Sequence, residues 1–175
     1  MKAITFGIGS VVLIYISRHS LRAPNSHGFY RFFAWECILG LFLLNVSFWF
    51  FKPFAWNQII AWILLFVSLI PLGFGIHFLR TRGKPIEKRD GDDSLLAFEK
   101  TTALVTSGIY KYIRHPLYSS LFLLTWGILF KHFSVAGILL AITAIIFLVF
   151  TAKADEAECI QFFGIEYSEY MKKTK

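Results

Sequence analysis

The sequence predicts an all-α protein that crosses a membrane with five helices and ends in a cytoplasmic carboxyl-terminal helix. We expect residues 1–175 to form a single membrane domain. Hydrophobic residues make up 56% of the chain and aromatic residues 18%, more apolar surface than a water-soluble fold of this size can bury. The apolar residues are gathered into separate runs, and the basic residues flank these runs. Both features are typical of a polytopic membrane protein.

Five apolar runs approach the roughly 20 helical residues that are needed to cross a bilayer. They are Ala3–Ser17, Phe32–Phe51, Gln58–Leu79, Leu117–Phe130 and Phe133–Phe150. Only Lys131 and His132 separate the last two runs, which predicts a tight antiparallel hairpin. The first and fourth runs are short. Either Tyr112 and Ile113 extend the fourth helix, or the short helices end within the headgroup layer.

The basic residues predict the orientation of the chain. With the amino terminus outside, 15 of the 18 Lys and Arg residues lie in the internal regions 18–31, 80–116 and 151–175. Because cytoplasmic segments are enriched in basic residues, we expect an external amino terminus and a cytoplasmic carboxyl terminus, in an inner or plasma membrane. Arg18 and Arg22 follow the first run where a signal peptide would have small residues, so we expect this run to be a membrane helix.

Composition also limits the partners of the protein. The net charge of +7 would suit nucleic acid. The basic residues flank apolar runs, however, so membrane lipids and no nucleic acid are the expected partners. Cys37 and Cys159 lie far apart, and their spacing does not indicate a zinc site. We therefore expect no metal. The polar segment Arg80–Thr102, with its charge-rich run at 84–93, is predicted to be a mobile solvated loop, and no function is assigned to it.

The residues before the fourth apolar run are suited to bind a small charged molecule. Arg114, His115 and Pro116 stand at the start of this run, and proline fits the first turn of a helix. Unpaired backbone N–H groups there favour an anion, to which Arg114 and His115 add charge and directed donors. Three tyrosines nearby have rings that stack on a base or contact a cation. They are Tyr110, Tyr112 and Tyr118. The alternative is headgroup anchoring with an aromatic belt.

The tail after the fifth run is predicted to be a helix with one packed face. At 100° per residue, one stripe consists of Ile160, Phe163, Tyr167 and Tyr170. Glu156 lies within this stripe. The other tail acids, Asp155, Glu158, Glu166 and Glu169, point elsewhere. A carboxylate on a packed face needs a partner, so Glu156 is the acid expected to hold a ligand. The alternative is an ion pair with Arg114 or Lys153, and a break at Gly164 would spoil the stripe.

Glu36 is a further candidate, because it is the only acid within a predicted span. It lies near the end of its helix, where an ion pair with Arg31 or Arg80 would satisfy it. We therefore favour a structural role for Glu36.

Two motifs in this order resemble the isoprenylcysteine carboxyl methyltransferase family and the related phospholipid methyltransferases. The first comprises Gly108–Tyr110 and Arg114–Tyr118, and the second comprises Asp155–Glu156 and Phe163–Tyr170. The resemblance implies a site for S-adenosyl-L-methionine (SAM). By this resemblance, the acidic pair Asp155 and Glu156 would close the site, and the residues that would line it are Leu104, Val105, Tyr110, His115, Pro116, Leu117 and Tyr118. Family members commonly carry an arginine where this chain has Thr151.

The resemblance implies an integral membrane methyltransferase that uses SAM and acts on an amphiphilic acceptor, similar to an isoprenylcysteine carboxylate. SAM would enter from the cytoplasm, and the lipid-like or prenylated acceptor would enter from the bilayer. Glu156 and Arg114 are the expected catalytic residues. Two alternatives remain open: a membrane reductase with a similar helical layout, and a small transport or scaffold protein without enzymatic activity.

Overall fold

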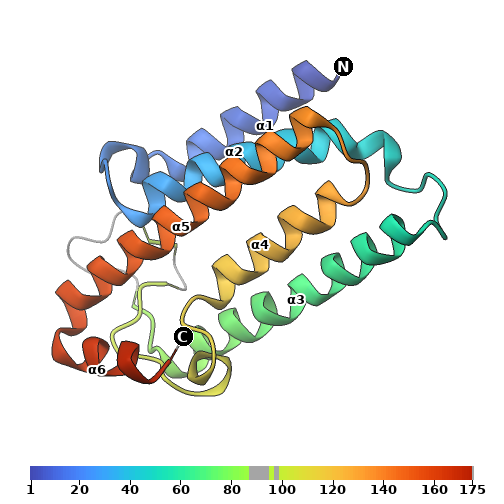
Figure 1. Ribbon diagram of the computed structural model, residues 1–175. Coiled ribbons are helices and arrows are strands. Elements are labelled where there is room, and N and C mark those ends of the chain that lie inside the picture. The colour runs from blue at the N-terminus through green and yellow to red at the C-terminus, as the bar shows by residue number, and fades with distance from the viewer. Residues whose placement is uncertain (87–94, 97–98, 175) are drawn as a thin grey trace.

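The apolar runs form helices in the computed structural model, which describes residues 1–86, 95–96 and 99–174 (Figure 1). Over these residues the chain has six α-helices and no β-strand. The helices are α1 (Lys2–Ser17), α2 (His27–Asn45), α3 (Trp56–Arg82), α4 (Pro116–Leu129), α5 (Val135–Phe163) and α6 (Ile165–Lys173). The predicted all-α class is therefore confirmed.

Three stretches of helix are long and apolar enough to cross a membrane: His27–Phe48, Trp56–Arg82 and Val135–Phe163. Helix α1 has 16 residues and α4 has 14, so both are shorter than the roughly 20 residues that a full crossing needs. The structure thus supports an integral membrane protein, while five crossings remain a prediction.

Helix α2 begins earlier than its apolar run, because Ser26 caps its amino-terminal end. The Ser26 hydroxyl accepts a hydrogen bond from the backbone N–H of Phe29 at 3.1 Å, which satisfies one of the free donors of the first turn. The helix therefore starts at His27 and not at Phe32. This early start places the polar side chains of its first turns at the same end of the bundle as α6.

Helix α4 begins at Pro116, so Tyr112 and Ile113 do not extend it. Proline disfavours helical backbone in the residue that precedes it, and His115 indeed has a non-helical ψ of 65°. Of the two possibilities for the short fourth run, the structure therefore shows a helix that stays short.

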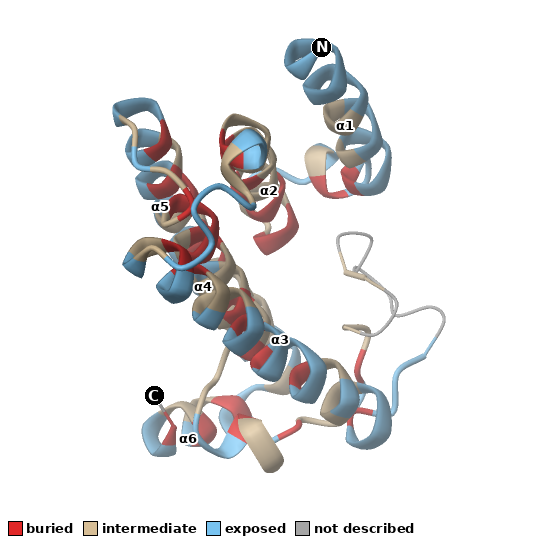
Figure 2. Ribbon diagram, turned by 90° about the vertical axis from the view of Figure 1, so that its right-hand side faces the viewer, coloured by how far each residue is buried: buried red, intermediate tan, exposed pale blue. Residues whose placement is uncertain are grey.

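The helices pack in two pairs, α2 with α5 and α3 with α4, and the hairpin of α4 and α5 joins the pairs. The buried core lies between α2, α4 and α5 and consists of Ile38, Leu41, Ile128, Leu129, Ala141 and Ala144. Large apolar residues such as Ile14, Phe66 and Ile142 are exposed, and the ribbons of α1, α3 and α5 carry many exposed positions (Figure 2). An exposed apolar surface of this kind suits contact with lipid.

The turn between α4 and α5 is tied to α3 at the end of the bundle far from α6. The Lys131 ammonium donates a hydrogen bond to Gln58 Oε1 at 3.1 Å and lies 3.7 Å from the centre of the Trp62 ring. The Gln58 amide in turn donates to the backbone carbonyls of Phe48 and Lys131 at 3.1 and 3.0 Å. These contacts fix the tight hairpin that the short connection predicts.

Candidate functional site

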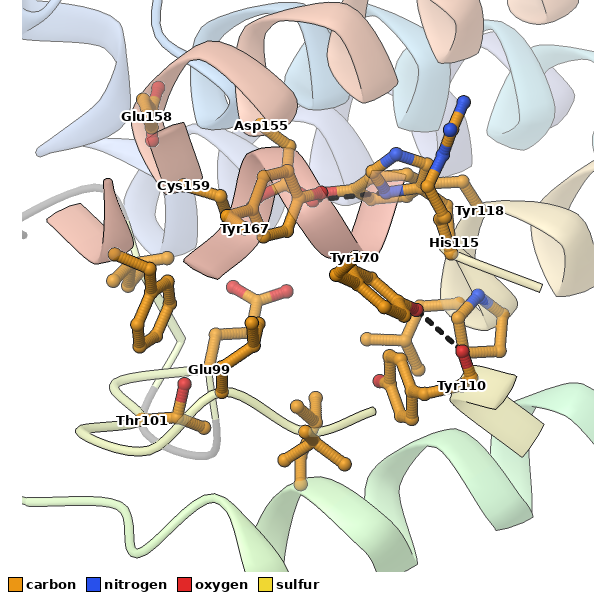
Figure 3. Close-up of a pocket in the computed structure, with 18 residues that line it drawn as sticks. Glu99, Thr101, Tyr110, His115, Tyr118, Asp155, Glu158, Cys159, Tyr167 and Tyr170 are labelled. Carbon is orange, nitrogen blue, oxygen red and sulfur yellow. Dashed lines mark hydrogen bonds and ion pairs between the residues drawn. The ribbon is translucent and has the colours of Figure 1, made fainter. Parts of the chain in front are cut away.

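A partly open pocket lies at the other end of the bundle, where α5, α6 and the loop before α4 meet (Figure 3). The space that the centre of a water-sized molecule can occupy in it measures about 110 Å³, and all of its empty space, open solvent included, measures about 800 Å³. The structure brings nine of the predicted site residues together around it. They are Leu104, Val105, Tyr110, Arg114, His115, Pro116, Leu117, Tyr118 and Asp155. Sequence motifs far apart in the chain thus share one cavity.

The loop before α4 owes its shape to a glycine and to two tyrosines. Gly108 has a φ of 65°, and a Cβ atom there would collide with the Phe78 ring. The 3₁₀ turn Gly108–Lys111 begins at this glycine, and Tyr110 within the turn is buried. The Tyr170 hydroxyl of α6 donates to the Tyr110 carbonyl at 2.6 Å, so α6 is fastened to the loop and closes one side of the pocket.

Arg114 joins three parts of the site. Its Nη1 atom donates to the backbone carbonyls of Met171 and Thr174 at 3.1 and 3.0 Å, which satisfies carbonyls at the end of α6. Its Nε atom lies 3.0 Å from Glu156 Oε1. The ion pair between Arg114 and Glu156, one of the alternatives for Glu156, is therefore present in the structure.

His115 lies between the two acids of the motif on α5. Its Nδ1 atom is 3.2 Å from Asp155 Oδ2, and its Nε2 atom is 3.2 Å from Glu156 Oε1. Burial alone would lower the pKa of His115, but hydrogen bonds and charges from Asp155 and then Glu156 outweigh it and raise the pKa. The imidazolium form, in which both ring nitrogens donate, is thereby favoured. The ring also stacks on Tyr118, with 5.4 Å between centroids.

The prediction that Asp155 and Glu158 point away from the site is wrong, whereas Glu156 meets Arg114 and His115, as a carboxylate on a packed face requires. Asp155 and Glu158 line the pocket, together with Cys159, whereas Glu156 is not among the lining residues. Helix α5 is continuous from Val135, so packing of its apolar part fixes the phase of its last turns. The predicted roles of Glu156 and Arg114 in cofactor binding and catalysis stay predictions.

The break at Gly164 explains why the predicted stripe failed. Gly164 ends α5 with a φ of 61°, and a second helix follows. Tyr167 and Tyr170 do line the pocket, but they do so from α6, so their positions carry no information about the phase of α5. Ile160, which the stripe placed inside, is 41% exposed.

A second group of charges adjoins the pocket and was missed from the sequence. Glu99, which lines the pocket, accepts hydrogen bonds from Arg31 Nη1 at 2.7 and 2.8 Å. The His27 ring Nδ1 lies 2.6 Å from Glu158 Oε2, and the His27 backbone N–H donates to Glu158 Oε1 at 2.8 Å. These contacts join residues 68 and 131 positions apart, which no local pattern reveals.

Burial and the neighbouring positive charges shift the pKa of Glu99 in opposite directions. Burial would raise the pKa of its carboxyl, but the charge of Arg31 and the hydrogen bond and charge of His27 outweigh it and hold the pKa below its ordinary value. Glu99 is therefore an anion in this structure. It belongs to the polar segment to which the sequence assigned no function. Most of the charge-rich run at 84–93 lies outside the described residues.

Three other residues that the sequence singled out do not line the pocket: Glu36, Tyr112 and Thr151. The Glu36 carboxylate accepts a hydrogen bond from the Ser10 hydroxyl at 2.7 Å. The suggested pair between Glu36 and Arg31 is wrong, because the Arg31 guanidinium binds Glu99. Tyr112 is 70% exposed and does not line the pocket, and the Thr151 hydroxyl donates to the Phe147 carbonyl of its own helix.

Comparison with known proteins gives the site a chemical context. Residues 92–164 match the phospholipid methyltransferase family. The predicted resemblance to the phospholipid methyltransferases is confirmed over this stretch, which contains α4, α5 and the motif residues up to Gly164. No curated protein and no solved structure matches the chain. The family match and the long apolar helices together support a membrane methyltransferase.

Proposed function

We propose that this protein is a SAM-dependent methyltransferase of the membrane, which binds SAM in the pocket and methylates an amphiphilic acceptor. One observation carries the proposal. The motif at Arg114–Tyr118 and the acid Asp155, both within the family match, line the same cavity at one end of a bundle of apolar helices. A pocket with convergent charged groups beside apolar walls suits a small amphiphilic ligand.

The side chains around the pocket fit the chemistry of SAM. The methionine part of SAM carries a carboxylate and an ammonium, and the site offers the imidazolium of His115 and the carboxylate of Asp155. The rings of Tyr110, Tyr118 and Tyr167 provide faces for the adenine base and for a sulfonium cation. When bound, SAM supplies an activated methyl group.

The protein has little covalent chemistry to perform in such a reaction. Its contribution is to orient the two reactants and to exclude water, which together account for a large part of the rate. Arg114 and Glu156 support this role, since their ion pair joins the loop before α4 to α5 and Arg114 also binds carbonyls at the end of α6. A carboxylate acceptor, as in the isoprenylcysteine substrates that the resemblance implies, needs no base, whereas an amine acceptor must first be neutral.

The pocket end is proposed to face the cytoplasm, so that SAM enters from there and the lipid-like acceptor enters from the bilayer. The support is the distribution of Lys and Arg, most of which lie in the connections at the pocket end and in the tail. The amino terminus and Lys131 lie at the opposite end, which would face outside.

Calorimetry on the purified protein tests this function. S-adenosylhomocysteine, the product of the cofactor, is expected to bind the wild type, and His115→Ala is expected to weaken that binding about 10- to 100-fold through the loss of a charged hydrogen bond. Tyr112→Phe is the matched control, because Tyr112 is exposed and lies outside the pocket. Binding of a nicotinamide dinucleotide in place of S-adenosylhomocysteine would instead support a reductase.

A further inference from the structure

We infer that Glu99 determines which ligand group the pocket accepts: Arg31 and His27 of α2 hold its carboxylate against the cavity, where it binds a positively charged nitrogen. This inference rests on the proposed function and deepens it. The nitrogen belongs either to the ammonium of the methionine part of SAM or to an amine of the acceptor. Glu99 would then be a residue that selects the ligand by charge.

Glu99 lies in the wall of the cavity, and the two cations that hold it lie outside the lining. Glu99 lines the pocket, but Arg31 and His27 are not among the lining residues. Arg31 binds both carboxylate oxygens, and the Leu96 backbone N–H donates to Oε2 at 2.8 Å. In Figure 3 the Glu99 carboxylate is directed into the space below Asp155 and Tyr167. A carboxylate has about four acceptor positions, so capacity remains for a ligand on that side.

The arrangement fixes the carboxylate before a ligand arrives. Arg31 is only 5% exposed and Glu99 only 10%, so both charges have lost most of their water. His27, with no exposed side-chain surface, lies with Nε2 3.9 Å from Glu99 Oε2. A desolvated carboxylate that is already oriented binds a cation more strongly than a mobile surface acid does.

Glu99 differs from Asp155 in where its partner cations lie, because His115 lines the cavity beside Asp155 whereas Arg31 and His27 do not line it. Among the described lining residues there are three carboxylates, Glu99, Asp155 and Glu158, and two cations, Arg114 and His115. His115 lies against Asp155, and Glu158 binds the start of α2 through His27. The partners of Glu99 lie outside the lining, so its side of the cavity favours a cationic group.

A paired substitution separates ligand binding from folding. Glu99→Gln alone would take the Glu99 carboxylate away from the buried Arg31 guanidinium, and removing one partner of a buried ion pair is strongly destabilising. The double variant Glu99→Gln with Arg31→Met removes both charges at once, and such replacements are often tolerated by the fold. A merely structural ion pair predicts that this double variant binds ligands normally. Our inference predicts a loss of affinity of about 10- to 100-fold for the ligand that carries the nitrogen.

Four probes identify the source of the nitrogen. S-adenosylhomocysteine has the amino-acid ammonium, whereas 5′-methylthioadenosine has the same adenosine and sulfur without it. Dodecylamine has an ammonium on an alkyl chain, and dodecanol is its uncharged counterpart. A selective loss of S-adenosylhomocysteine binding assigns Glu99 to the cofactor. A selective loss of dodecylamine binding assigns it to an amine acceptor. Both results support the inference.

Two outcomes would overturn it: wild-type affinity of the double variant for all four probes, or an equal loss for the charged and uncharged members of each pair. If the double variant does not fold, Glu99→Asp, which keeps the charge but shortens the side chain, is expected to give the same selective loss in a folded protein. Failure of the wild type to bind S-adenosylhomocysteine would contradict the proposed function instead, so the two failures are distinguishable.

Discussion

The two ends of the helix bundle bury polar side chains in different ways. At the end near α6, Arg114, His115 and Asp155 meet other charged side chains around a cavity. At the opposite end, amide side chains donate to backbone carbonyls: Asn45 to Ile128 at 2.9 Å and Asn57 to Phe130 at 3.0 Å. The contacts with Gln58 and Lys131 complete this second group.

The difference shows how burial can serve either stability or binding. A backbone carbonyl in a helix end has a fixed position, so an amide that binds it holds two helices together. A charged side chain beside a cavity can exchange one partner for another when a ligand enters. The opposite end is therefore expected to determine stability, and the pocket end is expected to determine ligand affinity.

The largest expected effect concerns the pocket end. Asp155→Asn removes the charge that faces His115 and the cavity, and it is expected to lower affinity for S-adenosylhomocysteine about 10- to 100-fold, because a hydrogen bond to a charged group contributes about 1.5–3 kcal/mol. Glu156→Gln is the matched control. Its side chain lies outside the pocket lining, so the loss of affinity should be smaller. A binding titration of both variants compares them, and the reverse order would contradict the geometry of the site.

A smaller effect on stability is expected at the opposite end. Gln58→Leu leaves the carbonyls of Phe48 and Lys131 and the Lys131 ammonium without this partner, so the free energy of unfolding should fall by about 1–3 kcal/mol. Thermal denaturation in detergent measures the change. Gln161→Leu, at an exposed position of α5, is the control and should be near neutral. Affinity of the folded variant for S-adenosylhomocysteine should stay unchanged; a loss there would show that the ends are coupled.

The features that the sequence predicted correctly depend on residues that are close together in the chain. Apolar runs placed the helices because every backbone group in a bilayer must find a partner within its own helix. The loop before α4 was predicted as a site because Arg114, His115 and Pro116 adjoin in the sequence, so their position at one helix start does not depend on the rest of the fold.

The features that the sequence did not predict depend on contacts between distant segments. The side of α5 that carries Asp155 is set by packing along the whole helix, and the tail sequence does not contain that information. Glu99 stood among other charged residues in a polar segment, where an acid is usually solvated. Its burial becomes visible only when α2 brings Arg31 and His27 beside it.

The smallest expected effects are opposite pH dependences of stability at the two ends. The pKa of His115 is raised above its ordinary 6.5, so the folded state binds more protons there and stability falls as pH rises from about 6.5 through the folded pKa. Burial lowers the pKa of Lys131 below its ordinary 10.5, so stability rises with pH between the folded pKa and 10.5. Both side chains keep hydrogen bonds when they titrate, which limits the size of each change.

Denaturation curves over this pH range, measured on two single variants, separate the two contributions. His115→Gln should make the decline that begins near pH 6.5 smaller, because glutamine keeps a donor without a titrating proton. Lys131→Met should remove the rise that approaches pH 10.5 and leave the decline in place. A profile that neither substitution changes would mean that the charge state of these two groups does not affect stability. The two ends of the bundle would then differ in their hydrogen bonds but not in how pH changes their stability.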